Sequence, residues 1–229
     1  MAPKVLIVLS SHEKLGDTGK KTGWYLPEFA HPYYKLAGKA DLTIASPKGG
    51  AAPLDESSVQ MFTDAESVKF LQEQEALWTN TEKLSTFLGR AGEFDAVFYV
   101  GGHGPMFDLA VDADSQQLIK EFYEAGKIVS AVCHGPIVLG DVKLTDGSFL
   151  VNGLTATGFT NAEEDQVGLS SVMPVLLETK LKDNGARFEQ AEPWAPFVVN
   201  GGEGGRVITG QNPASAGPIG DALLAALGA

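Results

Sequence analysis

Cysteine is the scarcest reactive residue in this chain of 229 residues, which contains only Cys133. One cysteine excludes an intrachain disulfide and a zinc site built from several cysteines, and it fits a reducing compartment. Basic side chains are also few, with 17 Lys and Arg against 29 Asp and Glu and a formal net charge of −12. Because phosphate binding relies on clustered Lys and Arg, this charge disfavours nucleic acid as a partner.

Long hydrophobic runs are absent. The apolar run nearest the N-terminus, Val5 to Leu9, is too short for a signal-peptide core or a membrane span. The chain also lacks internal repeats and low-complexity segments. We therefore expect a cytoplasmic protein that does not contact a membrane.

The sequence lacks the signatures of common bound cofactors. Its four histidines lie in separate predicted loops, without the paired spacing of zinc ligands. The glycine-rich segments 49–50 and 201–205 have neither a GxGxxG pattern nor a GKS or GKT pattern, so nucleotide phosphate binding is not indicated. We expect neither a metal nor a cofactor. The histidines are His12, His31, His103 and His134.

Short apolar runs are present and recur along the chain, each bounded by turn residues. Their continuous hydrophobicity indicates strands that are buried on both faces. Helical patterns lie between them, at 27–36 and from Ser115 to Gly126. This alternation predicts an α/β fold with a doubly wound, mostly parallel sheet and helices on both faces. The runs are 5–9, 42–45, 96–100 and 128–132.

The chain is long enough for one well-cored domain over residues 1–229, and a second domain is unnecessary. Segment 49–80 is acidic and poorly periodic, so we expect a loop-rich excursion from the sheet edge that covers the site or contributes to a dimer. Later patterns predict a helix at 174–182, a hairpin turn at 201–205 before a strand at 206–209, and a helix at 214–227. Asn212 is expected to cap that last helix.

Sites in such sheets form beyond the carboxyl ends of the strands. Three turns occupy these positions, at 10–12, 101–104 and 133–135. In the third, a strand runs into Cys133, His134 and Gly135, which resembles the nucleophile elbow of hydrolases, and Gly135 stands where a tight turn tolerates no bulk. Backbone N–H groups and a helix N-terminus at this bend would stabilise a thiolate.

Cys133 could also have a purely structural role, because a free cysteine beside a strand often only fills the core. The surrounding residues favour a nucleophile. His134 would shuttle the proton, unless it is a helix-cap or solvent histidine. The N–H groups of Gly102 and His134 are plausible donors to an oxyanion.

Three carboxyl groups are candidates for supporting roles. Glu163 and Glu164 could orient His134, and their rival interpretation is a solvated acidic loop near a helix start. Glu28 is either a surface helix residue or a buried acid that keeps its proton and donates to the sulfur.

Five motifs, taken in order and spacing over nearly the whole chain, resemble the ThiJ/PfpI superfamily. This superfamily is related to class I glutamine amidotransferases, and the resemblance is to its heat-shock-associated, glutathione-independent glyoxalase branch, also called glyoxalase III. The motifs are KTGWYLPEFAHP near the start, GGHGPMFD at 101–108, AVCHGP at 131–136, TGFTNAEE at 157–164 and TGQNPASA at 209–216.

The resemblance implies a flavodoxin-like fold, a homodimer and roles for named residues. It implies that Cys133 is the nucleophile, His134 its triad partner and Glu28 the acid that touches the thiol. The third triad member falls in TGFTNAEE, where the alignment favours Glu164 over Glu163. Oxyanion and substrate contacts fall to the turn residues Gly102, His103 and Gly135.

The implied reaction converts a small 2-oxoaldehyde, methylglyoxal or glyoxal, and water to lactate or glycolate without metal or glutathione. Cys133 would form a hemithioacetal and His134 would move the proton. Relatives in the superfamily also include amidases, peptidases and deglycases that use the same triad. A stress chaperone or an oxidant sensor in which Cys133 is oxidised is a rival from another class.

Overall fold

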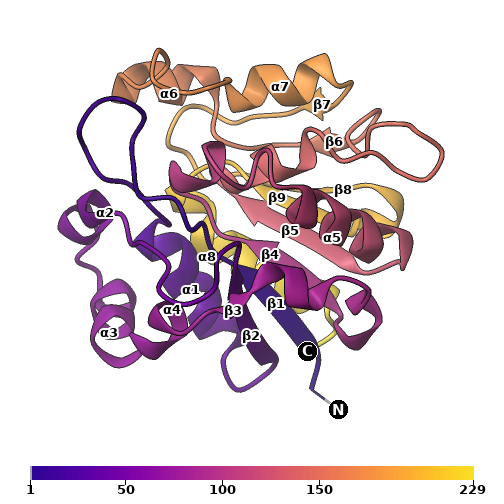
Figure 1. Ribbon diagram of the computed structural model, residues 1–229, viewed down its shortest axis with the longest axis horizontal. Coiled ribbons are helices and arrows are strands. Elements are labelled where there is room, and N and C mark those ends of the chain that lie inside the picture. The colour runs from indigo at the N-terminus through magenta and orange to yellow at the C-terminus, as the bar shows by residue number, and fades with distance from the viewer. Residues whose placement is uncertain (1) are drawn as a thin grey trace.

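The computed structural model describes residues 2–229, and its centre is one seven-stranded sheet (Figure 1). Every neighbouring pair of strands in this sheet is parallel except the pair at its C-terminal edge, which is antiparallel. The predicted doubly wound, mostly parallel α/β fold is therefore confirmed. Across the sheet the strands are β3 (Glu82–Lys83), β2 (Asp41–Ser46), β1 (Lys4–Val8), β4 (Ala96–Tyr99), β5 (Ile128–Val132), β9 (Val207–Gly210) and β8 (Val198–Gly201).

Helices cover both faces of the sheet. Successive side chains of each strand point to opposite faces, so each strand contributes residues to two separate hydrophobic clusters. Val5 and Ile7 of β1 belong to the cluster that contains helices α1 (Leu26–Leu36) and α8 (Ala216–Ala226). Leu6 and Val8 belong to the other cluster, with α5 (Ala113–Glu124). The continuous hydrophobicity of the strands thus reflects burial on two sides.

The remaining elements lie around this sheet. A separate parallel pair, β6 (Thr155–Ala156) and β7 (Arg187–Phe188), lies near helices α6 (Asn161–Val167) and α7 (Leu177–Asp183) at the upper edge of Figure 1. Short 3-10 helices complete the chain. They are Leu84–Phe87, Ala91–Glu93, Gly104–Met106, Gly135–Leu139, Glu203–Gly205 and Pro213–Ser215.

The predicted boundaries hold to within a few residues. Helix α1 runs through Pro32 without interruption, and α7 begins three residues later than predicted. The turn between β8 and β9 is the expected hairpin. The side chain of Asn212 accepts a hydrogen bond from the backbone N–H of Ser215, so the predicted cap is confirmed, although it caps a 3-10 turn that leads into α8.

Segment 49–80 leaves the sheet edge between β2 and β3, as predicted, but it is not loop-rich. It contains the short helices α2 (Glu56–Met61), α3 (Ala65–Glu73) and α4 (Ala76–Thr79). The side chains of Asp55 and Asp64 cap the first two of these helices. Helices of four to nine residues make too few turns for an apolar stripe to be visible, which is why the prediction failed.

The N-terminal and C-terminal parts of the chain meet, since α1 packs against α8. The division into a single domain over 1–229 stays a prediction, with which this packing agrees. Within residues 2–229, no helix combines the length and apolar character needed to cross a membrane.

Candidate active site

Cys133 sits on a strained turn at the carboxyl end of β5. Its φ is 60°, in the left-handed region that costs a residue other than glycine roughly 1–2 kcal/mol. Two backbone hydrogen bonds hold it there: its N–H donates to the carbonyl of Gly210 (2.9 Å), and its carbonyl accepts from the N–H of Phe159 (2.8 Å). The helix that follows is a short 3-10 helix, Gly135–Leu139. Backbone contacts with β9 and with Phe159 therefore hold the turn that carries the thiol.

Two glycines make room for this turn. A Cβ atom at Gly135 would lie 2.7 Å from the carbonyl oxygen of Tyr99, so the expected intolerance of bulk has a steric cause. A Cβ atom at Gly101 would lie 2.3 Å from Oε2 of Glu28 and 2.9 Å from Cβ of Cys133. The lack of a side chain at Gly101 thus allows the carboxyl group of Glu28 and Cys133 to lie next to each other.

His134 joins the thiol to a carboxylate. Its Nδ1 lies 3.4 Å from Sγ of Cys133, and its Nε2 lies 2.6 Å from Oε2 of Glu164. An ionised carboxylate only accepts hydrogen bonds, so Nε2 carries the hydrogen and Nδ1 presents a lone pair to the thiol. The alternative of a solvent-facing His134 is wrong, since the residue is buried.

Charges within this group favour a neutral imidazole beside an ionised carboxylate. Burial raises the pKa of Glu164, but the two neighbouring histidines outweigh it and bring the pKa well below its ordinary value. Burial lowers the pKa of His134, and His103 lowers it further, against the opposing effect of Glu164. At neutral pH, His134 is therefore a base.

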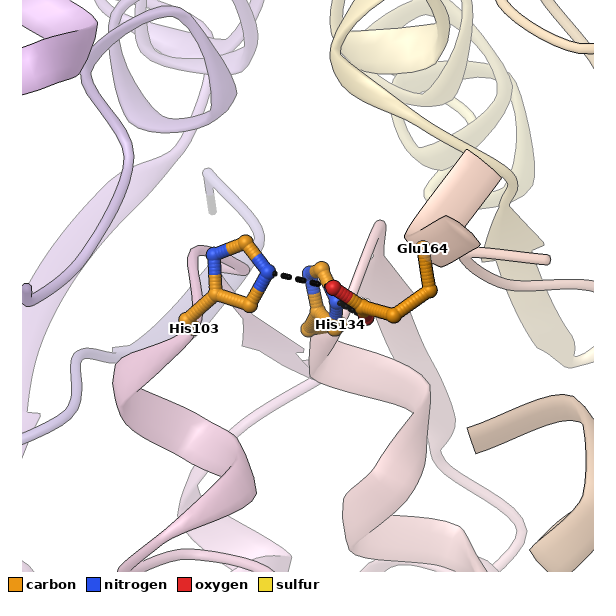
Figure 2. A group of neighbouring side chains, drawn as sticks. All are labelled: His103, His134 and Glu164. Carbon is orange, nitrogen blue, oxygen red and sulfur yellow. Dashed lines mark hydrogen bonds and ion pairs between the residues drawn. The ribbon is translucent and has the colours of Figure 1, made fainter. Parts of the chain in front are cut away.

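His103 makes a contact that the sequence did not indicate. Its Nε2 lies 2.9 Å from Oε1 of Glu164, and its ring centroid lies 4.1 Å from that of His134 (Figure 2). Glu164 therefore bridges two histidines. The ligand atoms of the three residues lie within 4.8 Å of one another, although the residues come from three separate segments of the sequence, with Glu164 on α6. Hydrogen bonding within the group accounts for their proximity, and the lack of a metal stays a prediction.

Glu28 is fully buried on α1 and faces the thiol region. Among residues 2–229, neither of its carboxyl oxygens has a partner in hydrogen-bond geometry. Burial raises the pKa of Glu28 to about 8, although the thiol and the N–H groups of Gly101 and Gly102 lie close enough to oppose the shift. The interpretation as a surface residue is wrong. The carboxyl group holds its proton at neutral pH, because an unpaired buried charge is costly.

The expectation that the turn lowers the pKa of Cys133 is not met. Burial raises the pKa of the thiol well above its ordinary value, Glu28 raises it further, and the N–H of Gly102 opposes both only weakly. The helix after the elbow makes little difference, because it is a single short 3-10 segment. Activation of Cys133 must therefore come from a base in contact, and His134 lies in that position.

Glu163 does not contact His134. It is buried, and its Oε1 accepts hydrogen bonds from the N–H of Trp194 (2.9 Å) and the side-chain amides of Gln211 (3.1 Å) and Asn212 (2.8 Å). Its other oxygen accepts from the N–H and hydroxyl of Thr160, which completes a capping box at the start of α6. The interpretation of both glutamates as a solvated acidic loop is wrong, since both are buried.

Above the thiol lies a cavity of about 310 Å³. Cys133, His134, His103 and Gly102 line it together with aromatic and aliphatic side chains. The stretch 49–80 contributes to this lining through α2, which agrees with the expectation that it covers the site.

The sequence profile of the DJ-1/PfpI family matches residues 28–225, a range that includes the thiol, both histidines and all three glutamates. The chain belongs to the DJ-1/PfpI family. It is 32% identical to Glyoxalase 3 of Candida albicans, over 97% of this chain and 98% of that protein. It is 30% identical to a glutathione-independent glyoxalase of Saccharomyces cerevisiae, over 94% of each.

Solved structures agree with this membership in the DJ-1/PfpI family. The chain superposes on the Rapid Encystment Protein 24 KDa of Francisella tularensis with a TM-score of 0.91 and 33% identity, over 98% of this chain and 99% of that one. It superposes on glyoxalase III of Candida albicans with a TM-score of 0.87 and 31% identity, over 98% and 97%.

Several residues that line the cavity of this DJ-1/PfpI protein were not candidates from the sequence, among them Tyr25 and Trp194. Tyr25 stands inside the motif KTGWYLPEFAHP and Trp194 inside EPWAPF. In the sequence, Tyr25 is recognisable only as an aromatic residue next to a helix start, and Trp194 only as one between two prolines. Many surface aromatic residues have the same neighbours, so neither pattern indicates a cavity. Only the fold brings these two segments to one cavity.

Proposed function

We propose that this protein is a glutathione-independent glyoxalase, which converts a 2-oxoaldehyde and water to the corresponding 2-hydroxy acid. The observation that carries the proposal is the contact of the buried Cys133 thiol with the unprotonated Nδ1 of His134. Similarity to proteins named glyoxalase over almost the full length supports it. The residue roles that follow are part of the proposal.

The first step is addition of sulfur to the aldehyde. His134 takes the thiol proton as the sulfur bonds to the aldehyde carbon, whose carbonyl electrons move to oxygen. The resulting oxyanion accepts hydrogen bonds from the N–H groups of Gly102 and His134. It then takes the proton from the imidazolium of His134, which gives a neutral hemithioacetal and a neutral imidazole. Glu28, as a neutral acid beside the sulfur, avoids repulsion with the forming thiolate.

The second step moves a proton between carbons. His134 removes the proton from the first carbon, and the electrons form a carbon–carbon double bond as the second carbonyl oxygen becomes an enediolate oxygen. The imidazolium of His134 then gives this proton to the second carbon, while the proton of the first hydroxyl moves to the enediolate oxygen. The product is a thioester of the 2-hydroxy acid. Water then attacks the thioester carbonyl, the acid is released and Cys133 regains its proton. The sum is one aldehyde and one water for one hydroxy acid, with no external oxidant or reductant.

Glu164 and His103 act through His134. The carboxylate fixes the tautomer that exposes Nδ1 to the thiol and stabilises the imidazolium that forms when the proton is taken. His103 occupies the second oxygen of the same carboxylate, at 2.9 Å, and so limits rotation of Glu164. A bulky residue at Gly135 or Gly102 would displace the turns that carry these groups.

The test is turnover of methylglyoxal by the purified protein, with formation and chirality of lactate followed by NMR. Cys133→Ala is expected to reduce the rate at least 1000-fold while leaving the circular dichroism spectrum unchanged, because the chain has no second thiol that could form the hemithioacetal. Val111→Ala, a change at an exposed surface residue, is the matched control and is expected to keep the rate. A wild-type protein that forms no lactate, or a Cys133→Ala protein that forms it normally, would overturn the proposal and favour a hydrolase or chaperone.

Two further expectations belong to this proposal. The homodimer rests on the family resemblance and is tested by light scattering of the purified chain. The cytoplasmic location rests on the single cysteine, which fits a reducing compartment, and it is tested by imaging a tagged protein in cells.

A further inference from the structure

A continuous aromatic surface runs outward from the catalytic histidine. The ring centroid of Phe159 lies 4.3 Å from that of His134, and the ring of Trp194 lies 5.7 Å further along, at 68° to Phe159. All three residues line the cavity above the thiol. A group attached to a carbonyl that is bound at Cys133 would therefore have aromatic surface beside it.

A second apolar group comes from the N-terminal half of the chain. Tyr25, which precedes α1, donates a hydrogen bond from its hydroxyl to Sδ of Met61 on α2 (3.5 Å). Its ring packs edge-on against Phe62, with centroids 5.6 Å apart. Tyr25 and Met61 line the same cavity, so its lining combines apolar side chains from two distant parts of the sequence.

Exposed apolar side chains are concentrated at this cavity. Within the described chain, five large hydrophobic residues are exposed, and three of them line it: Met61 (68% exposed), Val167 (41%) and Trp194 (43%). Apolar surface gathered at one site in this way is typical of a binding region. Scattered surface residues would not collect around the reactive thiol.

Trp194 is held in its position by specific contacts. Its φ is 67°, a strained conformation for a bulky residue that costs roughly 1–3 kcal/mol. The backbone N–H donates to Glu163 (2.9 Å), and the indole N–H donates to Oε1 of Gln166 (2.6 Å). The tryptophan is thus held in place before a ligand binds, and its side chain remains partly exposed to solvent.

The cavity is larger than methylglyoxal requires. Its volume of about 310 Å³ falls at the lower end of pockets that hold drug-sized ligands, roughly 300–1,000 Å³. Lys20 and Lys21 also line it, but both side chains are exposed, so solvent screens their charges. Apolar contact is therefore the main source of selectivity that the cavity offers.

We propose that the preferred substrates are 2-oxoaldehydes with an aryl or branched alkyl substituent, and that Trp194 is the residue that selects this substituent. This inference rests on the proposed glyoxalase function and names its substrate class. The chemistry is unchanged: phenylglyoxal and one water give mandelate, and isobutylglyoxal and one water give the matching hydroxy acid.

The experiment compares kcat/KM for phenylglyoxal, isobutylglyoxal and methylglyoxal in the wild-type protein, from initial rates of hydroxy-acid formation. We expect both bulky aldehydes to be at least tenfold more efficient substrates than methylglyoxal. Trp194→Ala is expected to reduce the ratio of bulky to small efficiency at least fivefold, mainly through KM. Trp194→Phe is expected to restore most of the ratio, because it returns an aromatic face to the wall.

The controls separate this inference from the function on which it rests. Val111→Ala changes an exposed apolar residue outside the cavity lining and is expected to leave the ratio unchanged. The inference alone would be overturned if the wild-type kcat/KM for methylglyoxal equalled that for the bulky aldehydes. It would also be overturned if Trp194→Ala kept the wild-type ratio. Failure to convert any of the three aldehydes would overturn the proposed function.

Discussion

At the scale of single residues, two carboxyl groups within one site differ in protonation because their neighbours differ. Glu28 is enclosed without a positive partner, and burial raises its pKa to about 8. Glu164 is also largely buried, but it lies between two imidazole rings that bring its pKa well below the ordinary value. Opposite shifts of this kind assign an acid and a base within one site. At neutral pH, Glu28 is therefore protonated and Glu164 is ionised.

These charge states predict a bell-shaped pH profile for kcat/KM. Activity should rise with pH as His134 loses its proton, and the midpoint should lie below 6.5 because the pKa of His134 is lowered. Activity should fall again near pH 8, where Glu28 ionises and repels the thiolate. Rates measured from pH 5 to 10 test both limbs.

Glu28→Gln is the matched variant for the alkaline limb. The amide stays neutral at every pH, so the fall near pH 8 should disappear while the acidic limb remains. An alkaline limb at the same pH in Glu28→Gln would show that another group causes it.

The sequence suggested that Cys133, His134 and Glu28 belong to one site, and the structure places them close together. Cys133 and His134 follow a buried strand directly, and Glu28 follows a proline at a helix start, so local patterns place them. The choice between Glu163 and Glu164 depends on helix rotation, which a motif does not specify. The thiol pKa was misjudged because it depends on complete burial, and burial comes from segments far away in the chain.

At the scale of elements, α6 separates the tasks of two adjacent glutamates. Consecutive residues on a helix point about 100° apart. Glu164 therefore reaches His134, whereas Glu163 turns toward Thr160 and the Trp194 segment. One short helix thus carries both the carboxylate that contacts His134 and the carboxylate that contacts the backbone of Trp194 in the cavity lining.

This division predicts opposite outcomes for two similar substitutions. Glu163→Gln places an amide N–H₂ among groups that all donate hydrogen bonds, so the free energy of unfolding should fall by about 1–3 kcal/mol. Glu164→Gln removes the charge that supports the imidazolium, so kcat should fall at least 100-fold with a smaller change in stability.

Urea unfolding and steady-state kinetics on both variants provide the comparison. If Glu163→Gln lost more kcat than Glu164→Gln, the assignment of Glu164 as the partner of His134 would be wrong. A tenfold loss of selectivity for bulky aldehydes in Glu163→Gln, by contrast, would agree with its contact to Trp194.

The sequence predicted the strands that are buried on both faces, and it did not predict the short helices that bury few residues. Strands β1, β4 and β5 are almost entirely apolar and buried on both faces, so the sequence predicted them. The edge strand β3 consists of the exposed residues Glu82 and Lys83, and no pattern in the sequence indicated it. Helix α3 buries only Ser67 and Phe70, so its sequence carries almost no stripe. Its start is marked by the Asp64 cap, a signal that exists in the sequence but is weak when it stands alone.

At the scale of the whole molecule, the two ends of the sequence combine to hold the buried acid. Helix α1 carries Glu28 and packs on α8, and a Cβ atom at Gly220 would lie 2.9 Å from Cα of Pro32. An ion pair between Lys35 and Asp221 (3.1 Å) joins the same helices at the surface. The fold thus buries a carboxyl group that the unfolded chain would expose, and this burial affects the stability of the entire protein.

The cost of burying Glu28 predicts how stability changes with pH. Its pKa is 4.5 in an unfolded chain and about 8 in the folded one, so the folded state binds the proton more tightly. A raised folded pKa contributes stability that is fully present below pH 4.5 and is lost as pH rises toward 8. Since one pKa unit corresponds to about 1.4 kcal/mol, the loss amounts to a few kcal/mol.

The free energy of unfolding of Glu28→Gln should therefore equal or fall below that of the wild type at pH 4. It should exceed the wild-type value by a growing amount up to pH 8, with a constant difference above that. Urea midpoints measured from pH 4 to 9 test this, with Glu189→Gln as the control because its side chain is exposed. A difference between wild type and Glu28→Gln that stays constant across this range would mean that the buried carboxyl does not retain its proton.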